Sequence, residues 1–198
     1  MTQPSPGTLA PAREPIGLYA NIAVAVPDRI AERLPQARPG VAPHVTVAHA
    51  QVDIGQYQRL RAVFAGSAPS TTLTGLTGFP IGLDGVGDFR ADAAWPVPAV
   101  YLRVVDPSGA LARLAAALDT EFGLRRRFRY TPHVTLAWRD RDLDPAAGDA
   151  ALDRVLVDHA DFRDQWTADR LTFQVATGTL LTPRRLTWGA ARTYPITH

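Results

Sequence analysis

Pro43-His44-Val45-Thr46-Val47-Ala48 recurs almost unchanged as Pro132-His133-Val134-Thr135-Leu136-Ala137, and this repeat decides the fold. Five of the six positions are identical, and the two histidines lie 133 − 44 = 89 residues apart in a chain of 198. In a β-strand, side chains at positions i and i+2 face the same side. Each copy therefore presents an imidazole and a hydroxyl on one face, while its aliphatic residues can enter a core on the other.

Two such strands facing one another would supply one imidazole to accept a proton and a second to donate one. They would also supply two hydroxyls that can hydrogen-bond an anion. A single His-x-Thr strand says little, because motifs this short match by chance. Two near-identical copies, each in the same place within a repeated order of elements, predict a paired catalytic site. Its members are His44, Thr46, His133 and Thr135.

The order of elements repeats in the two halves of the chain. Apolar runs and helical spacing predict strand, helix, motif strand, helix and strand at 16–26, 28–34, 42–50, 56–65 and 71–77. The second half repeats this order at 100–105, 111–122, 131–138, around 152–156 and at 171–176, with an extra strand at 186–191. A repeat this long indicates two similar lobes from a duplication, because a solenoid needs more and shorter repeats.

The chain divides into an arm and one domain. Residues 1–15 are rich in Pro, Thr and Ala without a hydrophobic period, so we expect a flexible arm. A single domain should follow at 16–198, with lobe 1 at about 16–81 and lobe 2 at about 99–198. The Gly- and Pro-rich segment at about 82–98 predicts a loop between the lobes, with Trp95 as a candidate lid.

Composition limits the possible functions. The chain has no cysteine, which excludes disulfides, zinc–thiolate sites and thiol nucleophiles. The longest apolar run is too short to span a bilayer, and no signal peptide is visible, so we expect a cytoplasmic protein that does not bind membranes. The net charge of +2 does not imply a general nucleic-acid-binding surface. All 21 basic residues are arginines, whose forked donors suit phosphate.

The paired motifs resemble those of the 2H phosphoesterases, most closely the LigT-like group of 2′-5′ RNA ligases and cyclic phosphodiesterases. The resemblance runs from about residue 16 to 194 and is strongest at 127–137. It implies a bilobal α+β fold with a rough two-fold axis, in which antiparallel sheets line a central cleft and helices pack outside. It also implies metal-independent hydrolysis of cyclic phosphodiesters, typically a 2′,3′-cyclic phosphate opened to a 2′-phosphate, without a cofactor.

The resemblance favours His133 as the general base and His44 as the general acid, whereas the residues alone allow either direction. No metal site is expected, because these histidines lack a carboxylate-rich neighbourhood. His49 is five residues from His44, so on a straight strand it faces away and is interpreted as structural. Members of the family often carry Arg after the second motif. Here Trp138 occupies that position and Arg139 comes next.

Five further residues are candidates for substrate binding: Arg127, Phe128, Arg129, Tyr130 and Arg139. The arginines before the second motif fit a solvated turn at a helix C-terminus and a phosphate contact equally well. The two aromatic residues can stack on a base or ribose, or can belong to the core. Arg139 shares strand parity with His133 if the strand continues straight.

The leading hypothesis is a phosphodiesterase, expected to be a monomer, whose partners are RNA ends with a cyclic phosphate or small cyclic nucleotides. One alternative is an enzyme that linearises cyclic di- or oligonucleotide signals, which would need room for at least two bases. A reversible 2′-5′ RNA ligase is a second alternative. A protein that binds RNA or nucleotides without turnover is a third, although such a protein has no need of a paired acid and base.

Overall fold

A computed structural model of the chain describes residues 17–37, 41–90, 98–126, 129–139, 144–178 and 186–197. In chain order its elements are β1 (Gly17–Ala25), α1 (Asp28–Ala31), β2 (His44–Gln51), α2 (Ile54–Phe64), β3 (Phe79–Asp88), β4 (Ala99–Val105), α3 (Ala110–Phe122), β5 (His133–Trp138), α4 (Pro145–Asp158), β6 (Arg163–Ala168), β7 (Arg170–Gly178), β8 (Thr187–Trp188) and β9 (Arg192–Pro195).

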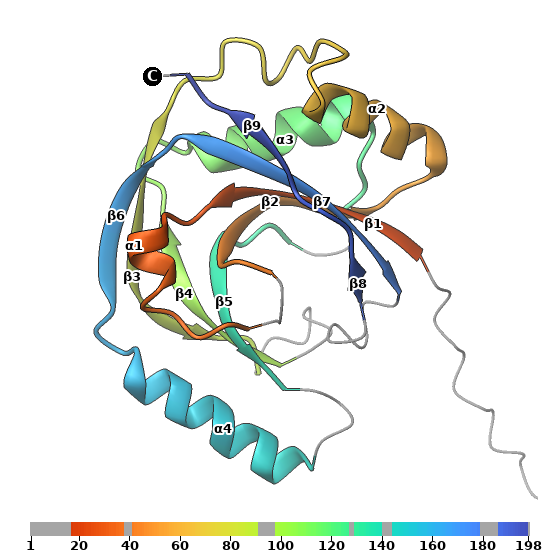
Figure 1. The fold of residues 1–198 in the computed structure, drawn as a ribbon. Helices are drawn as coiled ribbons and strands as arrows, with labels where there is room; N and C mark the ends of the chain where they lie inside the picture. The colour runs from red at the N-terminus through yellow and green to blue at the C-terminus, as the bar shows by residue number, and fades with distance from the viewer. Residues whose placement is uncertain are drawn as a thin grey trace, which may run out of the picture.

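The strands form one curled antiparallel sheet, an open half-barrel that the helices cover from outside (Figure 1). Its strand order is β6-β3-β4-β5-β2-β1-β7-β8, and β9 pairs with β7. The α+β class and the external helices are confirmed. The sheets expected for the two lobes are continuous with one another, because the motif strands β2 and β5 are hydrogen-bonded neighbours.

One face of the sheet forms the core with the helices. Val45 and Val134, the middle residues of the two His-Val-Thr motifs, are completely buried in it. The apolar residues of α3 pack there, and Gly123 ends that helix with a left-handed backbone (φ 65°). Strand alternation places the motif histidines and threonines on the opposite face of the sheet, called the site face below.

Residues 82–88, predicted to lie in a loop, belong to strand β3, so the prediction is wrong there. Its glycines serve close approach and curvature rather than a turn between elements. A Cβ atom on Gly87 would lie 2.3 Å from the ring of Tyr101 on β4, and Gly85 has a positive φ (65°) at a bulge opposite that strand. Residues 91–97, which include Trp95, lie outside the described residues.

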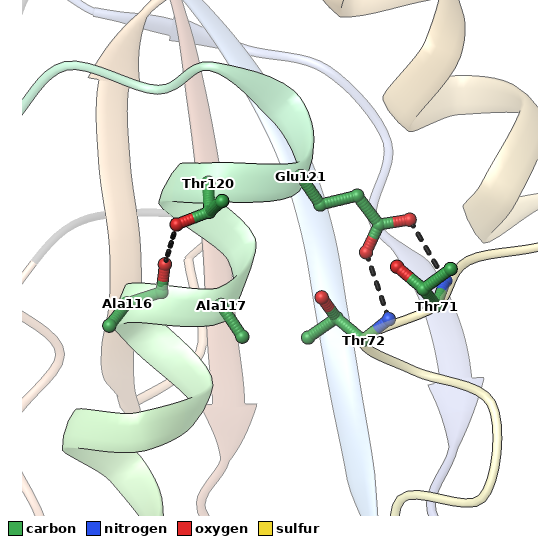
Figure 2. A pocket seen from close by; sticks show the side chains of 6 residues that line it. All are labelled: Thr71, Thr72, Ala116, Ala117, Thr120 and Glu121. Carbon is green, nitrogen blue, oxygen red and sulfur yellow. Dashed lines mark hydrogen bonds between the residues drawn. The ribbon is translucent and has the colours of Figure 1, made fainter.

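The strand predicted at 71–77 is also wrong, because most of this segment forms turns. The Glu121 carboxylate of α3 accepts a hydrogen bond from the Ser70 hydroxyl at 2.9 Å. It also accepts hydrogen bonds from the backbone N–H groups of Thr71 and Thr72 at 3.0 and 2.9 Å (Figure 2). These donors are therefore unavailable for a strand ladder. The pocket in Figure 2 lies beside this turn and is lined by small side chains and Glu121.

The sheet exchanges strands between the two halves of the chain. β3, which precedes the expected second lobe, pairs with β4, and β7 from the second half pairs with β1. The sequence pattern does not predict β6, and the strand predicted at 186–191 is limited to β8 and followed by β9. Each side of the sheet thus combines strands from both halves of the chain. Within the described residues, every helix is too short or too polar to cross a lipid bilayer.

Candidate functional site

The two motif strands meet at a single register pair, in which Val45 of β2 lies opposite Val134 of β5. One step along these antiparallel strands brings Thr46 beside His133, and one step the other way brings His44 beside Thr135. Each histidine therefore neighbours the threonine of the other motif around a local two-fold axis. The two motif strands, expected to supply one site together, are therefore neighbours in the same sheet.

In both histidines, a hydrogen bond from the ring to the backbone carbonyl two residues earlier orients the imidazole. Nδ1 of His44 lies 2.8 Å from the carbonyl oxygen of Ala42, and Nδ1 of His133 lies 2.7 Å from that of Thr131. A carbonyl can only accept, so in each histidine Nδ1 carries the proton that is donated. In the neutral imidazole, Nε2 is then the basic atom and is the position at which a proton is gained or lost.

The surroundings of His133 are apolar and aromatic. Its side chain is only 8% exposed, and the rings of Phe89 and Tyr101 meet it edge to face, with centroids 5.0 and 5.3 Å away. Burial, opposed by the hydrogen bond to Thr131 and assisted by the charge of His44, lowers the pKa of His133 from 6.5 to about 4. At neutral pH this imidazole is uncharged and can accept a proton.

The surroundings of His44 are more polar, and they include a residue that sequence reasoning missed. Nδ2 of Asn21 on β1 lies 3.3 Å from Nε2 of His44, and its Oδ1 lies 3.5 Å from the Thr46 hydroxyl. Asn21 is only 3% exposed and interrupts an otherwise apolar strand. A polar side chain in the middle of such a strand was the signal available in the sequence.

Both motif strands contain a β-bulge directly after the threonine. On β2, Thr46 pairs with Ala23 and Ala48 with Ile22, so that Val47 is the extra residue. On β5, Thr135 pairs with Tyr101 and Ala137 with Val100, which makes Leu136 the equivalent extra residue. An extra residue reverses the alternation of side chains beyond it. The straight-strand parity used for His49 and Arg139 is therefore wrong.

The bulge turns His49 toward the site face. It lies opposite Asn21, and its ring stacks on Tyr19 with centroids 5.9 Å apart and an interplanar angle of 6°. Trp188 of β8 also contacts it, with ring centroids 6.5 Å apart. His49 thus extends the row of His44 and Thr46 along β2, whereas straight-strand parity predicts a structural residue that faces away.

The second bulge turns Arg139 away and gives the equivalent site-face position to Trp138. The guanidinium of Arg139 forms an ion pair with Asp149 of α4 at 2.9 Å, and its stem packs against Gly148. A Cβ atom on this glycine would lie 2.7 Å from the Arg139 side chain. Arg139 therefore connects the end of β5 to α4. This position of its guanidinium does not support a role in substrate binding.

Of the other substrate-binding candidates, Arg127 and Phe128 lie outside the described residues, and Arg129 is exposed. Tyr130 packs against the hydrophobic core, and the guanidinium of Arg126 lies 4.6 Å from the centre of its ring. Burial raises the pKa of the Tyr130 hydroxyl. This packing agrees with the core alternative for Tyr130 rather than with stacking on a base.

One arginine next to the motif was missed. Arg103 of β4 lies directly opposite His133 in the ladder, so both side chains start from the site face. It is exposed, and its Nε donates to the carbonyl oxygen of Asp84 at 3.1 Å.

Within the described part of the chain, no cluster of three or more potential metal ligands occurs.

Comparisons with known proteins agree with this architecture. A model of the 2'-5' RNA ligase superfamily matches residues 19–179. The structure of E. coli LigT complexed with NADP+ has a TM-score of 0.56 and 18% identity, covering 92% of this chain and 99% of that chain. The complex of the same protein with 3'-AMP has a TM-score of 0.56 and 19% identity, covering 93% and 100%.

The structure of TT0787 from Thermus thermophilus has a TM-score of 0.57 and 14% identity, covering 90% of this chain and 97% of that chain. At such identities these structures establish a shared fold. The superfamily match confirms the resemblance to the 2H phosphoesterases. No curated protein matches the sequence.

Proposed function

We propose that this chain, which belongs to the 2′-5′ RNA ligase superfamily, is a metal-independent phosphodiesterase that hydrolyses cyclic phosphodiesters. Membership in a superfamily of phosphoesterases and ligases supports phosphodiester chemistry in general. The finer proposal rests on one observation, the pairing of Val45 with Val134, which sets each motif histidine beside the threonine of the other strand.

In the proposed reaction, Nε2 of neutral His133 accepts a proton from water as its oxygen forms a bond to phosphorus. The phosphorus–oxygen bond to one ribose oxygen breaks, and Nε2–H of protonated His44 donates its proton to that oxygen. The hydroxyls of Thr46 and Thr135 donate hydrogen bonds to the non-bridging oxygens, whose negative charge is greatest in the transition state. The product is a phosphate monoester on the other ribose hydroxyl.

The assignment of roles follows from the different surroundings of the two imidazoles. The lowered pKa of His133 keeps it neutral at physiological pH, as a general base requires. Nε2 of His44 faces the amide of Asn21 instead of an aromatic wall. An amide carries an oxygen as well as N–H groups, so it can also accept a hydrogen bond from a charged imidazole. We therefore assign the base to His133 and the acid to His44.

A hydrolysis screen in excess chelator tests the function. Substrates are 2′,3′-cyclic mononucleotides, RNA ends with a 2′,3′-cyclic phosphate, ADP-ribose cyclic phosphate and cyclic dinucleotides. Turnover of the first two classes would support the proposal, and turnover of cyclic dinucleotides alone would support the signal-linearising alternative. Joining of RNA ends by a 2′-5′ bond would identify a ligase. Binding without turnover of any substrate would contradict the proposal.

Substitution of the two histidines tests the mechanism. We expect His44→Ala and His133→Ala each to lower kcat by roughly 100-fold to 10,000-fold. The double variant should be little worse than either single variant, because groups that act as a unit give non-additive losses. His159→Ala is the control, since this histidine caps α4 through the carbonyl of Val155. Full activity in either single variant would rule out the paired mechanism.

A further inference from the structure

Asn21 is a buried amide at a position where packing alone would favour an apolar side chain. Its neighbours Ala20 and Ile22 on β1 are at most 1% exposed on the core face, while Asn21 projects to the site face and is 3% exposed. Burying an amide costs roughly 1–3 kcal/mol unless its hydrogen bonds are satisfied. Its amide contacts the histidine and the threonine of the first motif.

The contact is made to the atom of His44 that changes its protonation state. Because Nδ1 donates to the Ala42 carbonyl, only Nε2 can gain or lose a proton without moving the ring. In the neutral imidazole, Nε2 is an acceptor and is matched by Nδ2–H of Asn21, while Oδ1 accepts from the Thr46 hydroxyl. This arrangement satisfies the neutral state of His44.

We propose that Asn21 is a positioning residue whose amide rotates with the proton on His44, an inference that rests on the proposed function. When Nε2 is protonated, a half turn of the amide about χ2 presents Oδ1 to Nε2–H and Nδ2–H to the Thr46 oxygen. The threonine hydroxyl can either donate or accept, so both arrangements satisfy all three side chains. Asn21 exchanges no proton itself, and the ring of His44 stays in place throughout the cycle.

Within the described residues, an amide of this kind lies beside the first motif and not beside the second. Asn21 lies opposite His49 on β2, and the equivalent position beside β5 is Ala99, opposite Trp138. Alanine has no amide to rotate, and the imidazole of His133 instead faces two aromatic rings. The near-symmetric motifs are therefore differentiated by their neighbouring strands. An amide that accommodates both protonation states suits the histidine that arrives charged and leaves neutral.

Several other titratable groups lie on the same face around His44. They are Tyr19 on β1, His49 on β2, Tyr101 and Arg103 on β4, and His133 on β5. A substitution at Asn21 removes none of these groups. A shift in the titration of His44 that appears in Asn21 variants alone is therefore attributable to the hydrogen bonding and charge of the side chain at position 21.

The test measures the titration of His44 by NMR of the imidazole in the free protein, with the signal identified by its loss in His44→Ala. Asn21→Asp offers only acceptors beside Nε2, so we expect the titration midpoint to rise by about 1 pH unit or more. Asn21→Leu is similar in size and offers neither donor nor acceptor. Its apolar side chain should move the midpoint in the opposite direction, because the charged imidazole loses its acceptor.

The kinetic readout separates positioning from binding. Asn21→Leu and Asn21→Ala should lower kcat by roughly 10-fold to 100-fold while KM changes little. Gln174→Ala is the matched control, because Gln174 is the β7 partner of Asn21 and donates to Gly189 instead of to the histidine. This variant should retain the kinetics and the His44 midpoint of the wild type.

Equal midpoints in the Asp and Leu variants, or wild-type kcat in Asn21→Ala, would overturn the inference. If Asn21→Asp or Asn21→Leu does not fold, the alanine variant still decides, since it adds neither charge nor volume. Failure of the proposed function is distinguishable, because the NMR titration needs no substrate. If the wild type is inactive on every cyclic phosphate, the proposed hydrolase function is refuted. Opposite shifts of the His44 midpoint in the Asp and Leu variants would still support the contact between Asn21 and His44.

Discussion

The buried imidazole of His133 makes the stability of the fold depend on pH, and the structure gives the size of the effect. In the unfolded chain this group titrates near 6.5, whereas in the folded protein it accepts a proton only at about pH 4. The difference of 2.5 units corresponds to about 3 kcal/mol, at about 1.36 kcal/mol for each unit.

The sign follows from which state binds the proton. Between these two values the unfolded chain is protonated at His133 and the folded protein is not, so acid favours unfolding. The contribution of His133 to stability is complete above pH 6.5 and is lost progressively as the pH falls toward about 4. The folded protein disfavours the charged imidazole because the rings of Phe89 and Tyr101 surround it.

Urea unfolding of the wild type and of His133→Asn, at about pH 7.5 and about pH 4, measures the contribution of His133 to the free energy of unfolding. Asparagine can keep a donor near the Thr131 carbonyl but does not titrate, and all other ionisable groups are common to both proteins. We expect the wild type to lose about 3 kcal/mol more than the variant over this range. Equal losses in the two proteins would refute the assignment of a buried neutral imidazole.

Two substitutions on the glycine-rich strand and two on arginines give further tests. Gly87→Ala should cost roughly 1–3 kcal/mol in thermal or urea unfolding and lower activity, because its Cβ displaces the ring of Tyr101, whereas Gly82→Ala, with its nearest neighbour at 3.5 Å, should cost little. Arg139→Ala should lower the melting temperature without changing KM, because it loses the ion pair to α4. Arg103→Ala should raise KM for RNA ends and flatten their salt dependence, because it lies beside His133. A higher KM in the Arg139 variant alone would instead indicate that Arg139, and not Arg103, contacts the substrate.

The meeting of the two motifs is predictable from the sequence because it depends only on a repeated hexapeptide and on strand alternation over two residues. The positions farther along are not, because one inserted residue in each motif strand reverses the alternation, and Val47 and Leu136 look like ordinary core residues in the sequence. Alternation therefore holds from His44 to Thr46 and fails between Thr46 and His49.

The errors in the fold have a common physical cause. The glycines of β3 predict a loop, but the sheet needs them where Tyr101 lies against the backbone and where the strand bulges. The threonine-rich segment 71–77 has strand propensity, yet a distant carboxylate, Glu121, binds its backbone in turns. In both places a contact with a residue distant in sequence, which a local sequence pattern does not report, overrides the local secondary-structure propensity.

The pairing of β1 with β7 has a consequence for the synthesis of the chain. Asn21 of β1 lies opposite Gln174, so the strand that supports the first motif is completed by residues that are synthesised much later. Contacts so distant in sequence are slow to form, and the loop that they close is long. Until β7 leaves the ribosome, the nascent first half presents an open strand edge, the feature most prone to wrong pairing with another chain. Expression of this protein should therefore respond to chaperone supply and to growth temperature more strongly than its size suggests, and its first half should not fold when produced alone.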